Sequence, residues 1–270
     1  DEYDINLLFM PGIVDSFANH QSIVSKAVDM VEERGDVFLV VDPVGYGESP
    51  TTAQTRAEAR NSSYASMYYP WLRVGSPVLN QQVWVPPSVG VASVYSFNDK
   101  VSHPWFAPAG LNRGTIDSAL STERQLLRGQ RDNLYSSNVN PIATFPGQGV
   151  VVFGQKTLQA KPSALDRINV RRLLIALRKF IASTSKYLVF EQNTQALRNR
   201  FLNIVNPYLE QVQSNSGLSA FRVVMDDTNN TPEVVDRNQL IGQIFIQPTR
   251  TAEFIVLDFV VQPTGATFPE

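Results

Sequence analysis

The stretch Val37-Phe38-Leu39-Val40-Val41 decides the fold class of this chain. Its unbroken apolar run, stopped by Asp42-Pro43, predicts a strand that is buried on both faces. Ahead of it, Ile5 to Met10 forms another apolar run. Between the two runs, apolar residues recur at spacings of three and four up to Gly35, which predicts a helix with a glycine cap. A strand, a helix and a strand with short connections predict a βαβ unit and a parallel pair.

The next part of the chain gives weaker signals. Residues 45–65 are rich in Gly, Ser, Thr and Ala, and we interpret them as a loop with at most one helical turn. Prolines interrupt residues 68–74 and follow residues 83–85, so we expect irregular or edge strands there. Val89 to Val101 is ambiguous between helix and strand, and the prolines and glycines of residues 103–114 predict a shaped loop.

Helical patterns dominate the middle of the chain and strand patterns its end. The predicted helices are Ile116 to Leu134, Asp166 to Ser183 and Thr194 to Gln213. The predicted strands are Gly149 to Leu158, Phe221 to Met225, Leu240 to Ile246 and Phe254 to Val261. We therefore predict an α/β (mixed α+β) fold, a mixed β-sheet flanked by helices. A βαβ-type layer occupies residues 1–112, and a C-terminal helix-and-sheet domain with a terminal strand arm occupies residues 113–270.

Composition limits the classes of function. The chain has 270 residues, 43% of them hydrophobic and 18% charged, which is enough to bury a sizeable core. The net charge of −2 argues against a dedicated nucleic-acid binder. No cysteine is present, and no apolar run reaches the roughly 18 residues of a membrane span. The chain begins at Asp1 and enters a strand-like run almost at once, so we interpret it as part of a longer protein.

One turn is similar to part of an enzyme. The stretch Val41-Asp-Pro-Val-Gly-Tyr-Gly-Glu-Ser49 resembles the turn after an early strand of α/β-hydrolases. Those enzymes also need a Gly-x-Ser-x-Gly elbow and a late histidine, whereas this chain has no such elbow and only His20 and His103. We interpret the stretch as a glycine-rich turn, and an α/β-hydrolase-like enzyme that uses it remains the alternative.

Other sites of chemistry are not supported by the sequence. No phosphate-binding Gly-x-x-x-x-Gly-Lys segment occurs. The stretch Asp226 to Asn230 begins like a calcium loop, but Thr231 stands where that loop needs glycine and Arg237 where it needs glutamate. A polar turn is the better interpretation, because Asn and Asp bond their own backbone in turns. We predict no catalytic residue, no metal site and no cofactor.

A basic pattern lies on the helix predicted from residue 166. Its side chains project opposite the apolar stripe: Arg167, Arg171, Arg172, Arg178 and Lys179. Such a face is usually only solvated, but it can also contact an acidic partner. Glu123 falls on the apolar stripe of the preceding helix, and we expect it to pair with Arg113, Arg124 or Arg128 because an unpaired buried carboxylate is unfavourable.

Several segments in a fixed order resemble a known family. They are Phe106 to Gly114, Arg131 to Tyr135, Asn140 to Ile142, Asp166 to Arg172, Ser185 to Tyr187 with Phe190-Glu191, Phe221 to Thr231, and Asn238 to Pro248. Together they are similar to the C-terminal part of the tail sheath protein of contractile-tailed bacteriophages. Residues before Trp105 resemble the family only in the order of their predicted elements, which are a strand, a helix, a strand, an Asp-Pro turn and a tyrosine-rich segment.

The resemblance implies a structural protein of the virion and not an enzyme. In that family, subunits assembled in the host cytoplasm stack as hexameric rings into a helical sheath around an inner tail tube. Contraction of the sheath drives the tube through the host envelope. The implied partners are neighbouring sheath subunits and the tube protein, with no membrane span, no direct nucleic acid and no cofactor.

The resemblance also assigns two contact sites. An inward-facing basic helix would place Arg167, Arg171, Arg172, Arg178 and Lys179 against an acidic tube. The run Glu253 to Gln262 would add a strand to a neighbour's sheet edge, through Phe254, Val256, Asp258 and Val260. A nucleic-acid-binding module that uses the basic helix is a further alternative, which the net charge disfavours.

Overall fold

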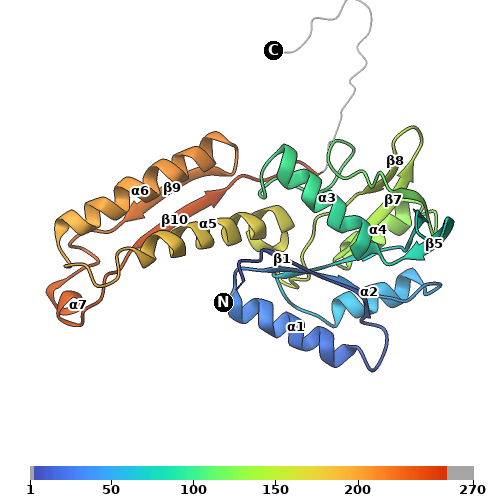
Figure 1. Ribbon diagram of the computed structural model, residues 1–270, viewed down its shortest axis with the longest axis horizontal. Helices are drawn as coiled ribbons and strands as arrows, with labels where there is room; N and C mark the ends of the chain where they lie inside the picture. Colours follow the sequence, from blue (N-terminus) through green and yellow to red (C-terminus); the bar gives the residue numbers. More distant parts are fainter. Residues whose placement is uncertain (1–2, 254–270) are drawn as a thin grey trace, which may run out of the picture.

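The computed structural model describes residues 3–253. Figure 1 shows two regions, which we call the body (residues 3–167) and the arm (residues 168–248). The arm extends to one side of the body, and its first helix begins inside the body.

A five-stranded sheet forms the centre of the body. Its strands are β1 (Leu7–Val14), β2 (Phe38–Asp42), β3 (Ala65–Tyr69), β7 (Val139–Phe145) and β8 (Gly149–Val152). They lie in the order β1-β2-β3-β7-β8, with parallel pairs up to β7 and an antiparallel β8 at the edge. The predicted βαβ unit is confirmed, since β1 and β2 pair in parallel on either side of α1.

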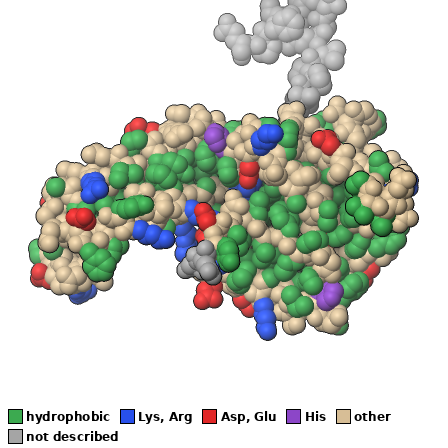
Figure 2. Space-filling model, viewed as in Figure 1, with side chains coloured by type: hydrophobic (Ala, Val, Ile, Leu, Met, Phe, Trp, Pro, Cys, Tyr) green, Lys and Arg blue, Asp and Glu red, His purple; other side chains and the backbone are tan. Residues whose placement is uncertain are grey.

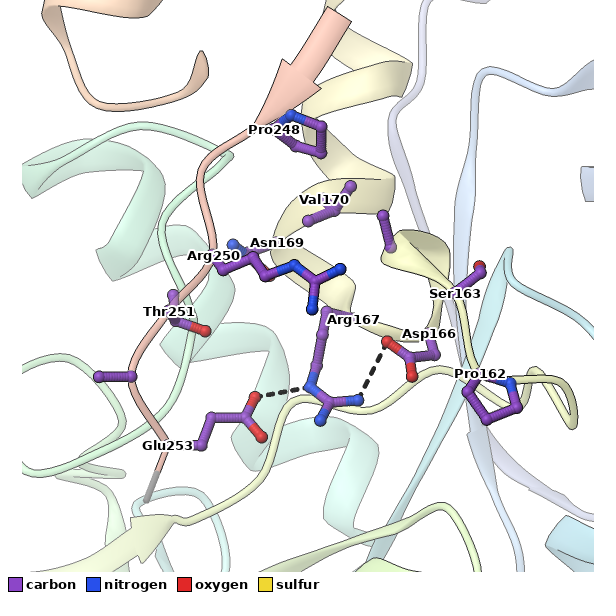
Figure 3. A pocket seen from close by; sticks show the side chains of 12 residues that line it. Pro162, Ser163, Asp166, Arg167, Asn169, Val170, Pro248, Arg250, Thr251 and Glu253 are labelled. Carbon is purple, nitrogen blue, oxygen red and sulfur yellow. Dashed lines mark hydrogen bonds and ion pairs between the residues drawn. The ribbon is translucent and has the colours of Figure 1, made fainter. Parts of the chain in front are cut away.

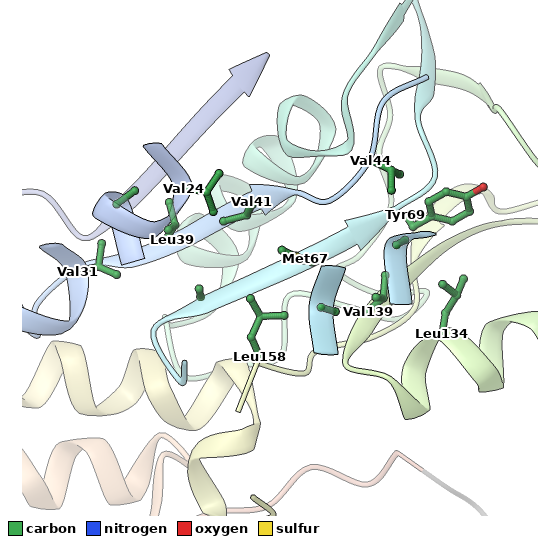
Figure 4. Packing of buried hydrophobic residues seen from close by; sticks show 14 of the residues in the cluster. Val24, Val31, Leu39, Val41, Val44, Met67, Tyr69, Leu134, Val139 and Leu158 are labelled. Atoms are coloured by element: carbon green, nitrogen blue, oxygen red, sulfur yellow. The ribbon is translucent and has the colours of Figure 1, made fainter. Parts of the chain in front are cut away.

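Helices cover both faces of this sheet. One face carries α1 (Gln21–Arg34), α2 (Pro50–Glu58) and α4 (Arg128–Ser136), and the other carries α3 (Pro87–Val101) and the start of α5 (Ile168–Lys186). Figure 4 shows the first face, where Val24 and Val31 of α1 pack on Leu39 and Val41. Successive residues of β2 point to opposite faces, so Leu39 enters this cluster and Val40 enters the other. This explains why the whole strand is apolar.

The remaining elements of the body close its rim. A small antiparallel sheet contains β4 (Leu72–Ser76), β5 (Gln81–Val85) and β6 (Ala119–Thr122). The loop at residues 110–116 covers the outer edge of β8: Gly110 donates to Val152 O, Val152 donates to Gly114 O, and Ile116 donates to Val150 O. A 3-10 turn, η1 (Ala164–Asp166), leads into α5.

The arm has its own small core. It contains α5, α6 (Gln195–Ser214), β9 (Leu218–Val224), α7 (Pro232–Asp236) and β10 (Gln243–Pro248). β9 and β10 form an antiparallel pair, and its inner face packs on α5 and α6 through residues such as Leu177, Phe201 and Leu209. Within the described chain, no other strand pairs with either outer edge of β9 and β10.

Several elements differ from the sequence predictions. Residues 50–58 form the helix α2 and not a loop, because Ser49 caps the first turn and Pro50 stands at its first position. β3 is a buried central strand and not an edge strand, since Pro70 follows the strand and removes no donor from it. The helix predicted from Ile116 to Leu134 is wrong: its two apolar ends belong to different segments, separated by β6.

The other long helices and the β-rich end of the described chain follow the prediction. Residues 89–101 are helical, and the helices predicted from Asp166 and Thr194 are α5 and α6. The mixed α/β class is confirmed. The five-stranded sheet continues past the division predicted at residue 112, since β7 and β8 complete it.

Candidate functional site

The basic residues of α5 occupy three different environments. Arg171 and Arg172 are 7% and 3% exposed, Arg178 is exposed, and Arg167 and Lys179 are intermediate. The expectation of one solvent-facing basic surface is therefore wrong for Arg171 and Arg172. At the start of α5 both sides of the helix are covered, because it lies between the body and the arm.

Arg172 ties α5 to α3. Its Nη1 and Nη2 donate to the two carboxylate oxygens of Asp99, at 2.8 and 2.5 Å, and its guanidinium lies 4.9 Å from the ring centre of Tyr95. The Tyr95 hydroxyl is 2.9 Å from that of Tyr68, and burial raises the pKa of Tyr95 to about 12. A bidentate pair of this kind fixes geometry as well as charge. Arg172 is thus part of the joint between body and arm.

Arg171 faces the opposite side of the joint. Its guanidinium lies 4.0 Å from the ring centre of Tyr64, and its Nη2 donates to Ser63 Oγ. Burial lowers the pKa of Arg171. A charge reversal at Arg171 would place a carboxylate in a buried site without a cationic partner among these contacts. Such a variant would lose folding stability, so a loss of partner binding could not be assigned to the surface charge.

Arg178 and Lys179 lie nearer solvent. Arg178 packs over Gly35, the left-handed residue that ends α1, where a Cβ would stand 2.0 Å from its Nη1. Lys179 Nζ donates to Asp4 Oδ1 and to Ile5 O. Figure 2 shows Lys and Arg side chains gathered along the concave border between arm and body. Of the five predicted contact residues, Arg178 alone is exposed, whereas the side chains of Lys179 and Arg167 are 24% and 26% accessible.

Arg167 belongs to a separate cluster at the end of the described chain. Its Nε donates to Glu253 Oε1 at 2.7 Å, and its Nη1 lies 3.0 Å from Asp166 Oδ1 (Figure 3). Glu253 also accepts from Tyr135 Oη and from Gln155 Nε2, at 2.8 and 3.0 Å. Beside this cluster a cleft of about 470 Å³ separates the first turns of α5 from residues 248–253.

The predicted linking strand lies outside the described residues. Phe254, Val256, Asp258 and Val260 follow directly after Glu253, and their role stays a prediction. What the structure does place is the root of that run, at the cluster of Arg167 and Glu253.

The hydrolase-like turn has structural contacts. Asp42 is buried, and its carboxylate accepts from Ser88 N and Ser88 Oγ at the start of α3. Burial raises the pKa of Asp42 to about 6, although both bonds from Ser88 act to lower it. Ser49 caps α2 by accepting from Thr52 N at 3.2 Å. The turn therefore connects and caps secondary structure.

The remaining candidate residues also have structural partners. His20 Nδ1 accepts from Val14 N, and His103 stacks on Trp105 with ring centres 4.5 Å apart. Glu123 accepts from Gly47 N at 2.8 Å, and no ion pair between it and an arginine is found in the described part of the chain, contrary to expectation. Asp226 Oδ1 accepts from Thr228 N, as in a polar turn.

Among residues 3–253, His, Asp and Glu side chains form no group of three that could hold a metal ion. Within the same range, no helix has the length and hydropathy needed to cross a bilayer.

Comparison with known proteins gives the family. Residues 1–158 match the phage tail sheath protein central domain, and residues 160–262 match the phage tail sheath C-terminal domain. The chain belongs to the phage tail sheath family. Tail sheath proteins of Vibrio phage KVP40 and Enterobacteria phage T4 are 42% and 41% identical over 187 residues, which are 69% of this chain and 28% of each relative. The chain thus spans little more than a quarter of the length of these relatives.

A solved sheath assembly has the same fold. It is the sheath complex of the extracellular contractile injection system PVC in its contracted state, with a TM-score of 0.81 and 25% identity over 96% of this chain and 71% of that one. The family resemblance noted in the sequence is confirmed. The relatives are tail sheath proteins and not enzymes, so the α/β-hydrolase alternative is not supported.

Sequence reasoning missed the groups that hold the sheath chain together. Glu253 meets Tyr135 and Gln155 from positions 118 and 98 residues away, and no local pattern signals such a contact. Asp99 is likewise 73 positions from Arg172. The one available signal was an acidic residue, Glu253, next to an apolar run, which is compatible with many roles.

Proposed function

We propose that this chain is the C-terminal part of a contractile tail sheath subunit. The subunit polymerises as a helical stack of hexameric rings around an inner tail tube, and its contraction drives the tube through the host envelope for genome delivery. The observation that carries the proposal is the match of both sheath family domains along the chain, supported by the likeness to a sheath complex in a contracted state. By this proposal the protein is a virion component assembled in the host cytoplasm.

The body and the arm have different structural properties, and each fits a different requirement of a sheath subunit. The body is a layered block with helices on both faces of its sheet, which keeps its shape while subunits move. The β9–β10 pair has outer edges that no other described strand covers. An extended segment can add to such an edge through backbone hydrogen bonds. Residues 254, 256, 258 and 260 of a neighbouring subunit are the proposed source of that strand.

The proposed tube contact is centred on Arg178 and Lys179. Both lie on α5 beside the first residues of the body, Arg178 over Gly35 and Lys179 at Asp4 and Ile5, and Arg178 makes no hydrogen bond or ion pair with residues 3–253. Arg171 and Arg172 support this surface by holding α5 on the body, and Arg167 acts at the root of the terminal run. An acidic tube surface would complement the two accessible cations, with attraction that weakens as salt rises.

Electron microscopy of the full-length parent protein tests the assembly proposal. We expect striated tubular polymers that form around the tube. A parent protein that stays monomeric with its tube partner present would contradict the proposal.

Charge reversal tests the tube contact. The double change Arg178→Glu and Lys179→Glu should lower co-sedimentation with the tube at least several-fold at low salt. Arg200→Glu, on the exposed face of α6, is the matched control and should leave tube binding unchanged. Equal loss of co-sedimentation in the double variant and in Arg200→Glu, or no loss in either, would show that this surface does not bind the tube.

A further inference from the structure

We propose that the carboxylate of Glu253 is a lock that fixes the root of the C-terminal segment to the body. This inference rests on the proposed function in one respect, namely that the segment beyond residue 253 links subunits. The lock itself is a property of the single chain. Its parts come from three places in the body: Tyr135 on α4, Gln155 after β8 and Arg167 at the start of α5.

The geometry surrounds one carboxylate with three donors. Oε1 of Glu253 accepts from Arg167 Nε at 2.7 Å and from Gln155 Nε2 at 3.0 Å, while Oε2 accepts from Tyr135 Oη at 2.8 Å. Gln155 Nε2 also donates to Thr251 Oγ1 at 2.6 Å, so a second residue of the segment is held. Bonds to a charged acceptor are stronger than neutral ones, and this side chain of Glu253 is only 16% exposed.

The charges around the lock are balanced when Glu253 is present. Lys156 Nζ lies 4.7 Å from the ring centre of Tyr135, and burial lowers the pKa of Lys156. Among the partly buried groups, Arg167 and Lys156 supply two cations and Asp166 and Glu253 supply two anions, while Arg250, which also lines the cleft, is exposed. Without Glu253, two partly buried cations would face a single carboxylate. The cluster therefore favours a carboxylate at this position over a neutral side chain.

The lock is separate from the sheet of the arm. β10 ends at Pro248, and Thr249 N donates to Gly217 O, which is the last backbone bond to the arm. Residues 250–252 then cross the cleft beside α5 before Glu253 reaches the body (Figure 3). The described part of the segment is thus attached at two points, and the second fixes the position of Glu253 on the body. A force applied to the segment would be transmitted to α4, to the start of α5 and to the residues after β8, and not to the two-stranded sheet.

The test uses the full-length parent protein with Glu253→Ala and the isosteric Glu253→Gln. Glu210→Gln, on the exposed face of α6, is the matched control. Arg250 is exposed and precedes the lock, so trypsin cleavage after Arg250 reports how firmly the segment is held. We expect this cleavage to be at least tenfold faster in Glu253→Ala, and less so in Glu253→Gln, which keeps one acceptor. Amides of β2 and β3 should keep their protection from hydrogen exchange in every variant, which separates release of the segment from unfolding.

Electron microscopy of the same proteins provides the second readout. With the lock released, we expect polymers that are shorter or less regular than those of the parent and of Glu210→Gln. Unchanged cleavage after Arg250 in Glu253→Ala, together with normal polymers, would overturn the lock and leave the sheath function standing. Faster cleavage in Glu253→Ala, with neither the parent nor the variant forming polymers under any condition, would support the lock and overturn the sheath function.

Discussion

The body and the arm bury their sheets in different ways. The five-stranded sheet of the body has helices on both faces, and the loop at residues 110–116 covers its β8 edge. The two-stranded sheet of the arm is covered by helices on one face, and its outer edges pair with no other described strand. A two-stranded pair is marginal by itself, so the arm depends on α5 and α6 for its order. One chain therefore separates a block that holds its shape from a surface that can be shared.

The helix α5 joins these two regions. Its first turns lie in the core of the body through Ile168 and Ile175, while Leu173 and Leu177 enter the core of the arm. The pair of Arg172 and Asp99 fixes the helix at the point where one core ends and the other begins. Because one rigid element belongs to both cores, a movement of the arm must be transmitted through this joint or must break it.

The largest expected effect comes from deleting one buried leucine in each region. Leu39→Ala in the body and Leu209→Ala in the arm both remove a fully buried side chain, and each should lower the free energy of unfolding by about 2–5 kcal/mol. Hydrogen exchange should separate them: Leu39→Ala exposes β2 and β3, whereas Leu209→Ala speeds exchange in α6, β9 and β10 and leaves β2 protected. Leu120→Ala, at an exposed position, is the control and should change stability by less than about 0.5 kcal/mol.

Identical exchange patterns in the two leucine variants would contradict the distinction between body and arm. The chain would then unfold as one cooperative unit, and the arm could not open while the body stays folded.

The next effect is the pH dependence of the body. Burial raises the pKa of Asp42 from an ordinary 3.8 to about 6, so the folded chain binds this proton more tightly than the unfolded chain does. The contribution of Asp42 to stability should therefore be greatest below pH 4, fall by up to about 3 kcal/mol as pH rises from 4 to 6, and then level off. Asp42→Asn should remove most of this fall, because an amide carries no charge to bury. Chemical denaturation at a series of pH values measures it.

The control for Asp42 lies in the arm. Asp226 is exposed, and its hydrogen bonds with Thr228 lower its pKa, the opposite direction. Asp226→Asn should leave the fall between pH 4 and 6 in place. If Asp42→Asn shows the same slope as the parent chain, another group is responsible for the pH dependence.

The smallest expected effect compares helix caps. Ser49 caps α2 in the body, and Thr194 caps α6 in the arm, each by accepting a backbone N–H. Ser49→Ala and Thr194→Ala should each cost about 1 kcal/mol of unfolding free energy, measured by denaturation. The two losses should add in the double variant, because the sites share no partner. Thr194→Ser keeps the hydroxyl and should restore most of the loss. A strongly non-additive double variant would show that the two regions are coupled more tightly than their separate cores imply.

Sequence reasoning succeeded where the signal was local and dense. The strand at Val37 to Val41 is an unbroken apolar run, and the helix ended by Gly35 and the helices α5 and α6 carry apolar residues at helical spacing. It failed at residues 116–134, where a few widely spaced apolar residues fitted a helical stripe by coincidence. It also failed at α2, a short helix with little apolar content, whose cap and proline were the only available signs.

The candidate site shows the same limit. The sequence correctly placed four of the five basic residues on one helix, with Arg167 directly before it, but it could not show that Arg171 and Arg172 are covered by aromatic rings from Tyr64 and Tyr95. Helical periodicity reports which side of a helix is apolar. It does not report whether a second element lies over the polar side.

The sequence by itself determined the fold class, the family and the absence of cysteine chemistry, because these follow from residue types and their order along the chain. The tertiary structure decided which charged groups are structural and which are accessible. It paired Arg172 with Asp99 and Arg167 with Glu253, from positions 73 and 86 residues apart, and left Arg178 at the surface. The physical reason is that the energy of a charge depends on its distance from partners and from water, and only folding sets those distances.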